Sequence, residues 1–314
     1  IDLYAKSGLY LTEIAKRLFV GLRKVIPDEE ERIRWILERQ LYGCAPSNII
    51  YNMVKNYVYA GFPEVNNGNL LELDLTEAAK EGQVKQVLAE RFGREMKFDV
   101  IIGNPPYQEE TLRTSDNPVY HLFMQEAYKL ADEVCLITPA RFLFDAGKTP
   151  KTWNQQMLND SNLKVVFYEH DSAKVFPGSV EIKGGITITY RNAKEKFTPV
   201  GVFSPKTELQ SILNKVRQSS FTPISNEVFL QNKFQLSELY KSNPDFRGLI
   251  GSNGKEKRLT TNIFSQLNIF TEKKSTEEDV CILGLINNVR CYRFISSTYL
   301  EPHESLMQYK IILP

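Results

Sequence analysis

An Asn-Pro-Pro-Tyr tetrapeptide, Asn104–Tyr107, stands directly behind a short apolar run, Phe98–Gly103. Two consecutive prolines donate no backbone hydrogen bonds and fix φ near about −65°, and Pro105 keeps Asn104 out of the helical region. The result is a stiff turn with free carbonyl oxygens, an amide at its start and an aromatic ring at its end. Such a turn suits a site that accepts hydrogen bonds from an amino group and stacks a flat base.

The position of the tetrapeptide favours a functional interpretation over an ordinary turn. Asn-Pro and Pro-Pro dipeptides commonly mark turns, but the apolar run in front predicts a strand bounded by turn residues. In open α/β sheets, ligands bind beyond the carboxyl ends of such strands. This junction resembles motif IV of the adenine-N6-specific DNA methyltransferases of restriction–modification systems.

The resemblance implies transfer of a methyl group from S-adenosylmethionine to N6 of an adenine flipped out of double-stranded DNA. Asn104, Pro105, Pro106 and Tyr107 would form the catalytic motif. The Asn104 side chain and the Pro105 carbonyl would accept the amino hydrogens, and Tyr107 would stack on the base. Asn at the first position favours adenine over cytosine within this family.

Residues 1–11 predict a strand end, a loop with small residues and a helix start. Such a junction directs backbone N–H groups at a polar ligand. Lys-Ser-Gly alone is typical of a turn, and it is no Walker A loop, whose glycines precede the lysine. Beside the tetrapeptide, the segment resembles a variant of cofactor motif I. Asp2 would then lie near the methionine end of the cofactor, with Ala5 and Gly8 in the loop.

The remaining cofactor positions are implied by the resemblance, and one of them departs from the family. Motif II would place an acidic residue for the ribose where this chain has Ala45. Residues 68–71 fit motif III, so Asn69 would accept from the cofactor adenine, with Leu70 beside it. Phe123, in a predicted helix over 119–131, would lie against that adenine. A loop residue at Asn69 and a helix-core residue at Phe123 are the alternatives.

A second aromatic ring is expected opposite Tyr107. Phe176 lies in a loop between predicted strands at 164–169 and 185–190, where the family places the other wall of the base pocket. Extrusion of a base costs a few kcal/mol, and stacking worth about 1–3 kcal/mol per base offsets much of this cost. The alternative is that Phe176 anchors the core.

The same loop also carries a loose nuclease pattern. Asp171 followed by Glu181 and Lys183 is similar to the arrangement of metal-dependent nucleases, whose carboxylates hold magnesium. So short a pattern arises often by chance, and it overlaps a segment that the methyltransferase interpretation already uses. We expect no metal site.

Predicted strands alternate with helices up to about residue 198. Over residues 1–198, this alternation predicts an α/β fold with a mostly parallel, doubly wound sheet. The resemblance identifies it as the S-adenosylmethionine-dependent methyltransferase fold. Residues 199–314 lose this alternation and are expected to form a smaller α+β target-recognition region. Its basic loop contains Lys255, Lys257 and Arg258, which either contact DNA phosphates or form a solvated surface.

Composition sets outer limits on the function. The chain has 314 residues with 42% hydrophobic residues and a formal charge of +1, so a DNA-binding surface must be local. Its four cysteines show no paired zinc-ligand spacing, which suits a reducing cytoplasm. No signal peptide and no apolar run of about 18 residues is present, so we expect no membrane association.

The order of the motifs resembles the gamma group of amino-methyltransferases, including large enzymes that fuse modification to restriction. Nuclease or helicase domains of the same longer chain are therefore expected partners. Little chain precedes motif I, and the sequence stops within an apparent strand at 309–314, so we expect a fragment with weak cofactor binding. A non-catalytic DNA-binding module with a decayed methyltransferase fold is the alternative, and Ala45 and Asn69 are consistent with it.

Overall fold

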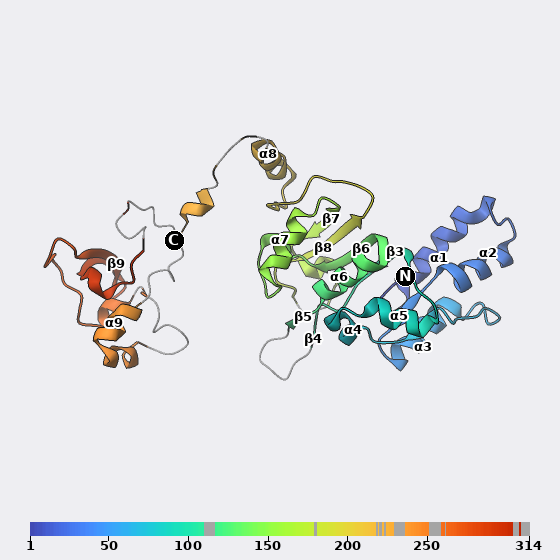
Figure 1. The fold of residues 1–314 in the computed structure, drawn as a ribbon, viewed down its shortest axis with the longest axis horizontal. Helices are drawn as coiled ribbons and strands as arrows, with labels where there is room; N and C mark the ends of the chain where they lie inside the picture. The colour runs from blue at the N-terminus through green and yellow to red at the C-terminus, as the bar shows by residue number, and fades with distance from the viewer. Residues whose placement is uncertain are drawn as a thin grey trace. The chain divides into compact units, whose positions relative to one another are not determined.

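The computed structural model describes residues 1–109, 117–178, 181–217, 219, 222, 224–228, 236–250, 259–260, 262–303 and 308. The chain divides into two compact units, Ile1–Ser219 and Ser220–Pro314 (Figure 1), and each is described by itself. None of the described helices is long and apolar enough to cross a membrane.

The first unit alternates helices and strands along most of its length. Its α-helices are α1 (Leu9–Gly21), α2 (Glu29–Trp35), α3 (Asn48–Tyr59), α4 (Thr76–Glu81), α5 (Val84–Phe92), α6 (Tyr120–Leu130), α7 (Lys151–Asn159) and α8 (Thr207–Arg217). Its strands are β1 (Gly43–Ala45), β2 (Leu70–Glu72), β3 (Phe98–Gly103), β4 (Gln108–Glu109), β5 (Asn117–Pro118), β6 (Ala131–Pro139), β7 (Leu163–Glu169) and β8 (Ile186–Asn192). Short 3-10 turns cover Leu22–Lys24, Arg141–Phe144 and Ser172–Lys174, and a π-helical turn covers Ile36–Gln40.

The main sheet has the strand order β3-β6-β8-β7. Strands β3 and β6 are parallel, whereas β8 is antiparallel to both of its neighbours, β6 and β7. Consequently β3, β6 and β7 share one direction, and β8 is the reversed strand between them. Strands β1 and β2 form a separate parallel pair.

Residues 1 and 2 connect the two sets of strands. The backbone nitrogen of Ile1 donates to the Val100 carbonyl at 2.8 Å, and the Ile1 carbonyl accepts from the Ile102 N–H at 3.0 Å. On the other side, Asp2 forms a parallel bridge with Gly43 of β1. The backbone order is therefore β2, β1, residues 1–2, β3, β6, β8, β7. This confirms the predicted α/β class with a mostly parallel sheet.

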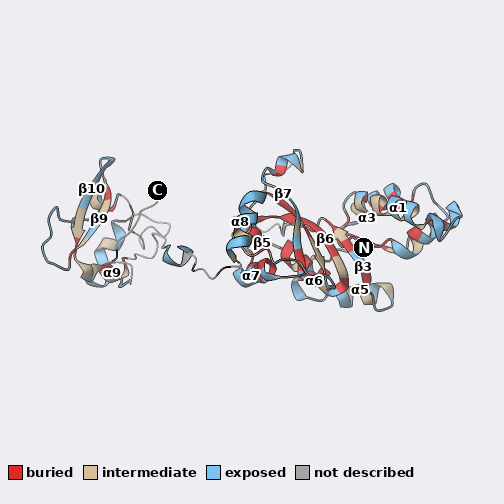
Figure 2. Cartoon of the chain, turned by 90° about the horizontal axis from the view of Figure 1, so that it is seen from above, coloured by how far each residue is buried: buried red, intermediate tan, exposed pale blue. Residues whose placement is uncertain are grey.

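Two apolar clusters lie on opposite faces of this sheet. Successive residues of a strand point to opposite faces, and Leu70 packs into a cluster with α1 and α3, whereas Leu71 packs into one with α4 to α7. The larger cluster includes Leu88, Phe123 and Leu136, all at most 5% exposed. Figure 2 shows the resulting concentration of buried residues along β3, β6 and α6. Helices thus cover both faces, as a doubly wound fold requires.

The second unit is built around a β-hairpin and short helical turns. Its elements are α9 (Ser237–Ser242), β9 (Val280–Ile286), β10 (Val289–Ile295), and 3-10 turns at Ile224–Glu227, Pro244–Gly248, Ile263–Ser265 and Ser297–Tyr299. Strands β9 and β10 pair antiparallel through Asn287 and Asn288, whose φ angles of 50° and 62° are typical of a type I′ hairpin turn. Lys255, Lys257 and Arg258 lie outside the described residues, so their contact with phosphates stays a prediction.

A substitution of Gly185, the residue directly before β8, would test how closely the chain packs beside the predicted base pocket. Its φ is +81°, and a Cβ there would lie 2.3 Å from the Glu169 carbonyl oxygen and 2.7 Å from the His170 Cα. We expect Gly185→Ala to lower the free energy of unfolding by at least about 1–3 kcal/mol, because the strain adds to a backbone clash. Urea denaturation measures the change.

Gly21 provides the matched control, since it ends α1 with a helical φ and no atom lies within 4 Å of an added Cβ. Gly21→Ala should leave the unfolding free energy unchanged or raise it by about 0.5–1 kcal/mol. An equal effect of the two substitutions would contradict the packing at Gly185.

Candidate active site

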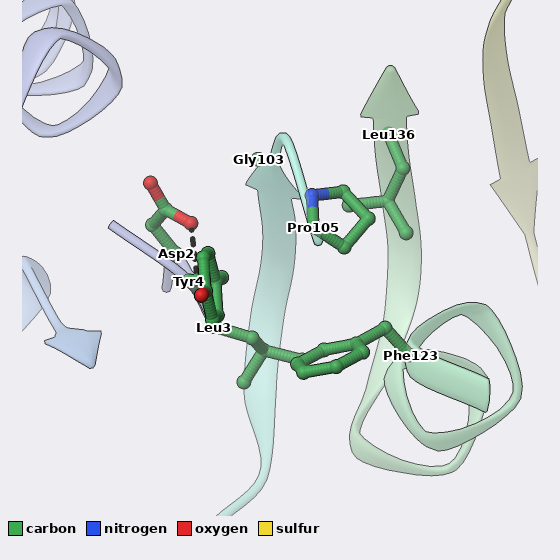
Figure 3. Close-up of a pocket in the computed structure, with 7 residues that line it drawn as sticks. All are labelled: Asp2, Leu3, Tyr4, Gly103, Pro105, Phe123 and Leu136. Atoms are coloured by element: carbon green, nitrogen blue, oxygen red, sulfur yellow. Dashed lines mark hydrogen bonds between the residues drawn. The ribbon is translucent and has the colours of Figure 1, made fainter. Parts of the chain in front are cut away.

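The carboxyl ends of residues 1–2, β3 and β6 meet at one edge of the sheet. A small cavity lies there, lined by Asp2, Leu3, Tyr4, Gly103, Pro105, Phe123 and Leu136 (Figure 3). Its volume is about 10 Å³, which is room for about one water molecule. The structure thus brings together three residues that the sequence singled out separately: Asp2, Pro105 and Phe123.

Asp2 is a buried carboxyl with an incomplete set of partners. It is 2% exposed, and its Oδ1 accepts one hydrogen bond, from the backbone N–H of Tyr4 at 3.0 Å. Burial raises the pKa of Asp2 to about 6, since a carboxylate loses hydration inside the protein. A hydrogen-bond donor or a cation on a ligand would stabilise its charged form.

Gly103, the last residue of β3, permits the close approach of Asp2. A Cβ on Gly103 would lie 2.5 Å from Oδ1 of Asp2, well inside van der Waals contact. The position of the Asp2 carboxyl therefore explains why the residue before the tetrapeptide is a glycine. It links the catalytic turn to the predicted cofactor loop.

Two aromatic rings form the wall of the cavity on the side of α6. Phe123 is 1% exposed, and its ring meets that of Tyr4 edge to face, with centroids 5.9 Å apart. Phe123 belongs to the larger apolar cluster and also lines the cavity. The two interpretations of Phe123, as a helix-core residue and as a residue that contacts the cofactor, are therefore compatible.

The loop between Asp2 and α1 packs tightly. Ala5 is fully buried, and its backbone N–H donates to the Cys44 carbonyl at 2.8 Å. Gly8 has φ +83° directly before α1, and a Cβ there would lie 3.1 Å from a methyl group of Val58. Glycine is required at this position both for its conformation and for the close packing against α3.

The tetrapeptide presents a buried polar atom that has no partner. Oδ1 of Asn104 and the hydroxyl of Tyr107 are both inaccessible to solvent, and Oδ1 of Asn104 forms no hydrogen bond with any described residue. The Asn104 side chain acts on the Tyr107 hydroxyl as a hydrogen-bond partner. Burial raises the pKa of Tyr107 above its usual range, so the hydroxyl is a neutral donor. A buried group without a partner costs about 1–3 kcal/mol, which a ligand with matching polar groups would recover.

Phe176 lies beside Tyr107. The ring centroids are 6.4 Å apart and the planes are tilted by 58°. A base stacked between two parallel rings at van der Waals contact needs about 7 Å between them. To hold a base between them, the two rings therefore need to move slightly farther apart and to rotate toward a parallel orientation.

Ala45, the departure from the family pattern, is the last residue of β1 and lies at the ligand edge. It is 0% exposed, and its carbonyl accepts from the Leu73 N–H at 2.7 Å. Its methyl side chain has no polar atom, so this position gives a ribose no hydrogen-bond acceptor.

Asn69 is not brought to the site. It precedes β2, and its side-chain Nδ2 donates to the Glu38 carbonyl at 2.6 Å. Leu70, the first residue of β2, is buried in the cluster of α1 and α3. Both residues lie at the amino end of β2, whereas ligands bind at the carboxyl end.

Asp74 stands at the position that the sequence interpretation gave to Asn69. It follows the carboxyl end of β2, and its charge contributes to a raised pKa of Tyr4, so it lies near the cavity wall. Its Oδ1 also accepts from the Thr76 N–H at 2.8 Å, which begins α4. The signal that locates Asp74 is the short strand Leu70–Glu72 in front of it.

Asp171, the first residue of the nuclease pattern, begins a short helical turn. Oδ1 of Asp171 accepts from the Ala173 N–H at 3.0 Å and begins the turn Ser172–Lys174. No group of three His, Cys, Asp or Glu side chains that could hold a metal ion occurs in the described part of the chain.

Residues 13–176, more than half of the chain, match the family model described as Eco57I restriction-modification methylase. A protein of Mycoplasma pneumoniae named "Uncharacterized adenine-specific methylase" is 26% identical over 241 residues, 58% of this chain and 57% of that protein. The chain therefore spans somewhat over half the length of this relative.

Among solved structures, the type I restriction enzyme EcoKI M protein is similar over 64% of this chain and 41% of its own, with 12% identity and a TM-score of 0.46. The Type ISP restriction-modification enzyme LlaBIII bound to DNA is similar over 96% of this chain and 28% of its own. That match has 13% identity and a TM-score of 0.48.

Because the Asp2 carboxyl is buried, we expect it to make the free energy of unfolding depend on pH, and Asp2→Asn should remove this dependence. The folded protein holds this proton up to about pH 6, whereas the unfolded chain releases it near pH 3.8. Stability therefore falls as the pH rises through these values, by about 3 kcal/mol in all. Compared with Asp2→Asn, the wild-type protein should lose about 2 kcal/mol of this between pH 4 and pH 7, because the unfolded carboxyl is already partly ionised at pH 4.

Urea titrations of both proteins at pH 4, 5, 6 and 7 measure this difference. A difference that grows in favour of the wild-type protein as the pH rises would show that Asp2 is stabilised as a carboxylate.

Proposed function

We propose, since this chain belongs to the Eco57I restriction-modification methylase family, that it transfers a methyl group from S-adenosylmethionine to N6 of an adenine extruded from double-stranded DNA. The observation that carries this proposal is the unpartnered, buried Oδ1 of Asn104 next to the rings of Tyr107 and Phe176. An acceptor for an amino group and two stacking surfaces occur together, and an adenine supplies the groups that match them.

The residues that would hold the cofactor lie around the small cavity. Bound S-adenosylmethionine would supply an electrophilic methyl group on its sulfonium centre. Asp2 would accept hydrogen bonds from its charged amine, Tyr4 and Phe123 would give apolar contact, and Asp74 would accept from a further donor. Because the cavity has a volume of about 10 Å³, the aromatic walls must separate on binding. Ala45 contributes no polar contact.

Activation of the target amine falls to the tetrapeptide. The lone pair of an exocyclic adenine nitrogen is delocalised into the ring, so the amine is a poor nucleophile. Oδ1 of Asn104 and the Pro105 carbonyl would accept hydrogen bonds from the two N–H groups of the amine. These hydrogen bonds favour a tetrahedral nitrogen and localise its lone pair for in-line attack on the methyl group. The same oxygens stabilise the positive charge that develops on nitrogen.

The reaction needs no covalent enzyme intermediate. Cys44, the cysteine nearest to the cofactor loop, is fully buried, and burial raises its pKa to about 12. A thiol in that state is a poor nucleophile, which agrees with direct transfer from cofactor to base.

The wider assignments extend the same proposal. The second unit would recognise the target sequence, with Lys255, Lys257 and Arg258 on DNA phosphates. Nuclease or helicase domains of a longer chain would be its partners, and the protein would act in the cytoplasm. The order of the motifs along the chain supports this arrangement.

A second candidate function is a non-catalytic DNA-binding module. The buried, apolar Ala45 at the position of a ribose acceptor favours it. This candidate retains the base pocket but binds the cofactor weakly or not at all, so an assay that separates cofactor binding from transfer distinguishes the two.

Asn104→Ala should strongly reduce kcat for methyl transfer without loss of cofactor affinity. Removal of a preorganised hydrogen-bonding group typically costs about 10²- to 10³-fold in kcat. Transfer of labelled methyl from S-adenosylmethionine to genomic DNA measures kcat, and calorimetry measures the cofactor Kd. Asn69→Ala, at the opposite end of the strands, is the matched control and should remain active. Absence of any labelling of DNA by the intact wild-type protein, whether or not it binds the cofactor, would instead support the non-catalytic module.

Tyr107→Ala and Phe176→Ala should each lower kcat/KM for DNA through loss of stacking worth about 1–3 kcal/mol per base. A fluorescent adenine analogue at the methylated position reports on extrusion and should show less of the extruded state in both variants. Phe62→Ala replaces an aromatic side chain that is 38% exposed and should change neither quantity. Normal extrusion in the Phe176 variant would assign that residue to the core alone.

A further inference from the structure

Lys6 places a positive charge over the ring on which the target base is expected to stack. It lies in the loop between Asp2 and Gly8, and its ammonium nitrogen is 5.7 Å from the centroid of the Tyr107 ring. The residue is exposed. The predicted cofactor loop and the catalytic turn therefore meet through this side chain at the mouth of the base pocket.

The ammonium group of Lys6 has no ion-pair or hydrogen-bond partner among the described residues. Asp2 is the acidic side chain that acts on Lys6 at a distance, but its carboxyl is buried and bonded to the Tyr4 N–H. Several other cations of the first unit are paired with carboxylates: Lys16, Arg32, Lys80, Lys85, Lys97, Lys129, Lys151, Lys174, Arg191 and Lys194. Arg32 and Arg191 also lie over aromatic rings, but both are ion-paired. Lys6 differs from all of these cations because its contact is the ring of Tyr107 and not a carboxylate.

We propose, on the basis of the function proposed above, that Lys6 binds a backbone phosphate of the extruded nucleotide. A base that stacks on Tyr107 brings its flanking phosphates to the rim of the pocket, where an exposed ammonium can donate up to three hydrogen bonds. A cation–π contact at an exposed site is worth only about 0.5–1 kcal/mol, so the side chain can leave the ring when a phosphate arrives. Lys6 is thus a positioning residue for the target nucleotide.

The cofactor carboxylate is the other anion that this loop could meet. The position of Lys6 favours the phosphate, because the ammonium lies over Tyr107, on the side of the target base. Binding of phosphate by Lys6 therefore agrees better with the position of its ammonium group.

The test is the salt dependence of methyl transfer in the intact protein. The logarithm of kcat/KM for genomic DNA, plotted against the logarithm of KCl concentration, has a slope that reports the number of phosphate contacts. Loss of one contact lowers its magnitude by about 0.9. We expect this decrease in Lys6→Met and a normal slope in Lys6→Arg. Lys16→Met, which removes a lysine paired with Glu13, is the matched control and should keep the wild-type slope.

Each other outcome is also decisive. An unchanged slope in Lys6→Met overturns the phosphate contact. A weaker cofactor Kd with an unchanged slope assigns Lys6 to the cofactor carboxylate and likewise overturns it. Absence of methyl transfer in the wild-type protein is a different result, since it removes the proposed function itself.

Discussion

The insertion of residues 1 and 2 between β1 and β3 is the constraint on which the rest of the site depends. Backbone hydrogen bonds hold Ile1 to β3, and a parallel bridge holds Asp2 to Gly43 of β1. This pairing joins the two-stranded sheet of β1 and β2 to the four-stranded sheet, and it places the Asp2 carboxyl against the backbone of Gly103. The segments that follow these strands therefore converge at one edge. The loop after Asp2 and the Asn104–Tyr107 turn are neighbours because their strands are neighbours.

The catalytic turn is built at some cost to stability. Asn104 buries a side-chain oxygen without a partner among the described residues, and Tyr107 buries a hydroxyl at the other end of the turn. Stability alone would favour apolar side chains of the same shape at both positions. The proline pair between them explains how the turn persists, because fixed φ angles reduce the entropy that folding must overcome. Unsatisfied groups held by a rigid backbone are what a preorganised binding site requires. In the proposed reaction, the amino group of the target base would complete the hydrogen bond that Asn104 leaves open.

Much of this architecture could be predicted from the sequence, and the parts that could not have physical reasons. Strand β3 coincides with the apolar run Phe98–Gly103, because an apolar run that ends at turn residues is a local signal. Phe176 lies beside Tyr107, an arrangement that only the family resemblance suggested, since the two residues are far apart in the sequence. The reversed direction of β8 was not predicted, since periodicity carries no information on strand direction. Asp74 was missed because β2 has only three residues. Lys6 was noted only as part of a turn, since its contact with Tyr107 joins residues a hundred positions apart.

The small cavity and the raised pKa of Asp2 have the same physical origin at this edge of the sheet. With about 10 Å³ between Tyr4, Phe123 and Pro105, the apolar walls lie close together, and water is excluded from the carboxyl that they cover. Exclusion of water is what raises the pKa of Asp2, so any ligand that separates the walls also changes the ionisation of this group. A cationic ligand gains the full attraction of a carboxylate only after the proton has left. Opening of the walls, release of the proton and binding of the ligand are therefore linked steps, and affinity for a cation at this edge must rise with pH through the range in which Asp2 ionises.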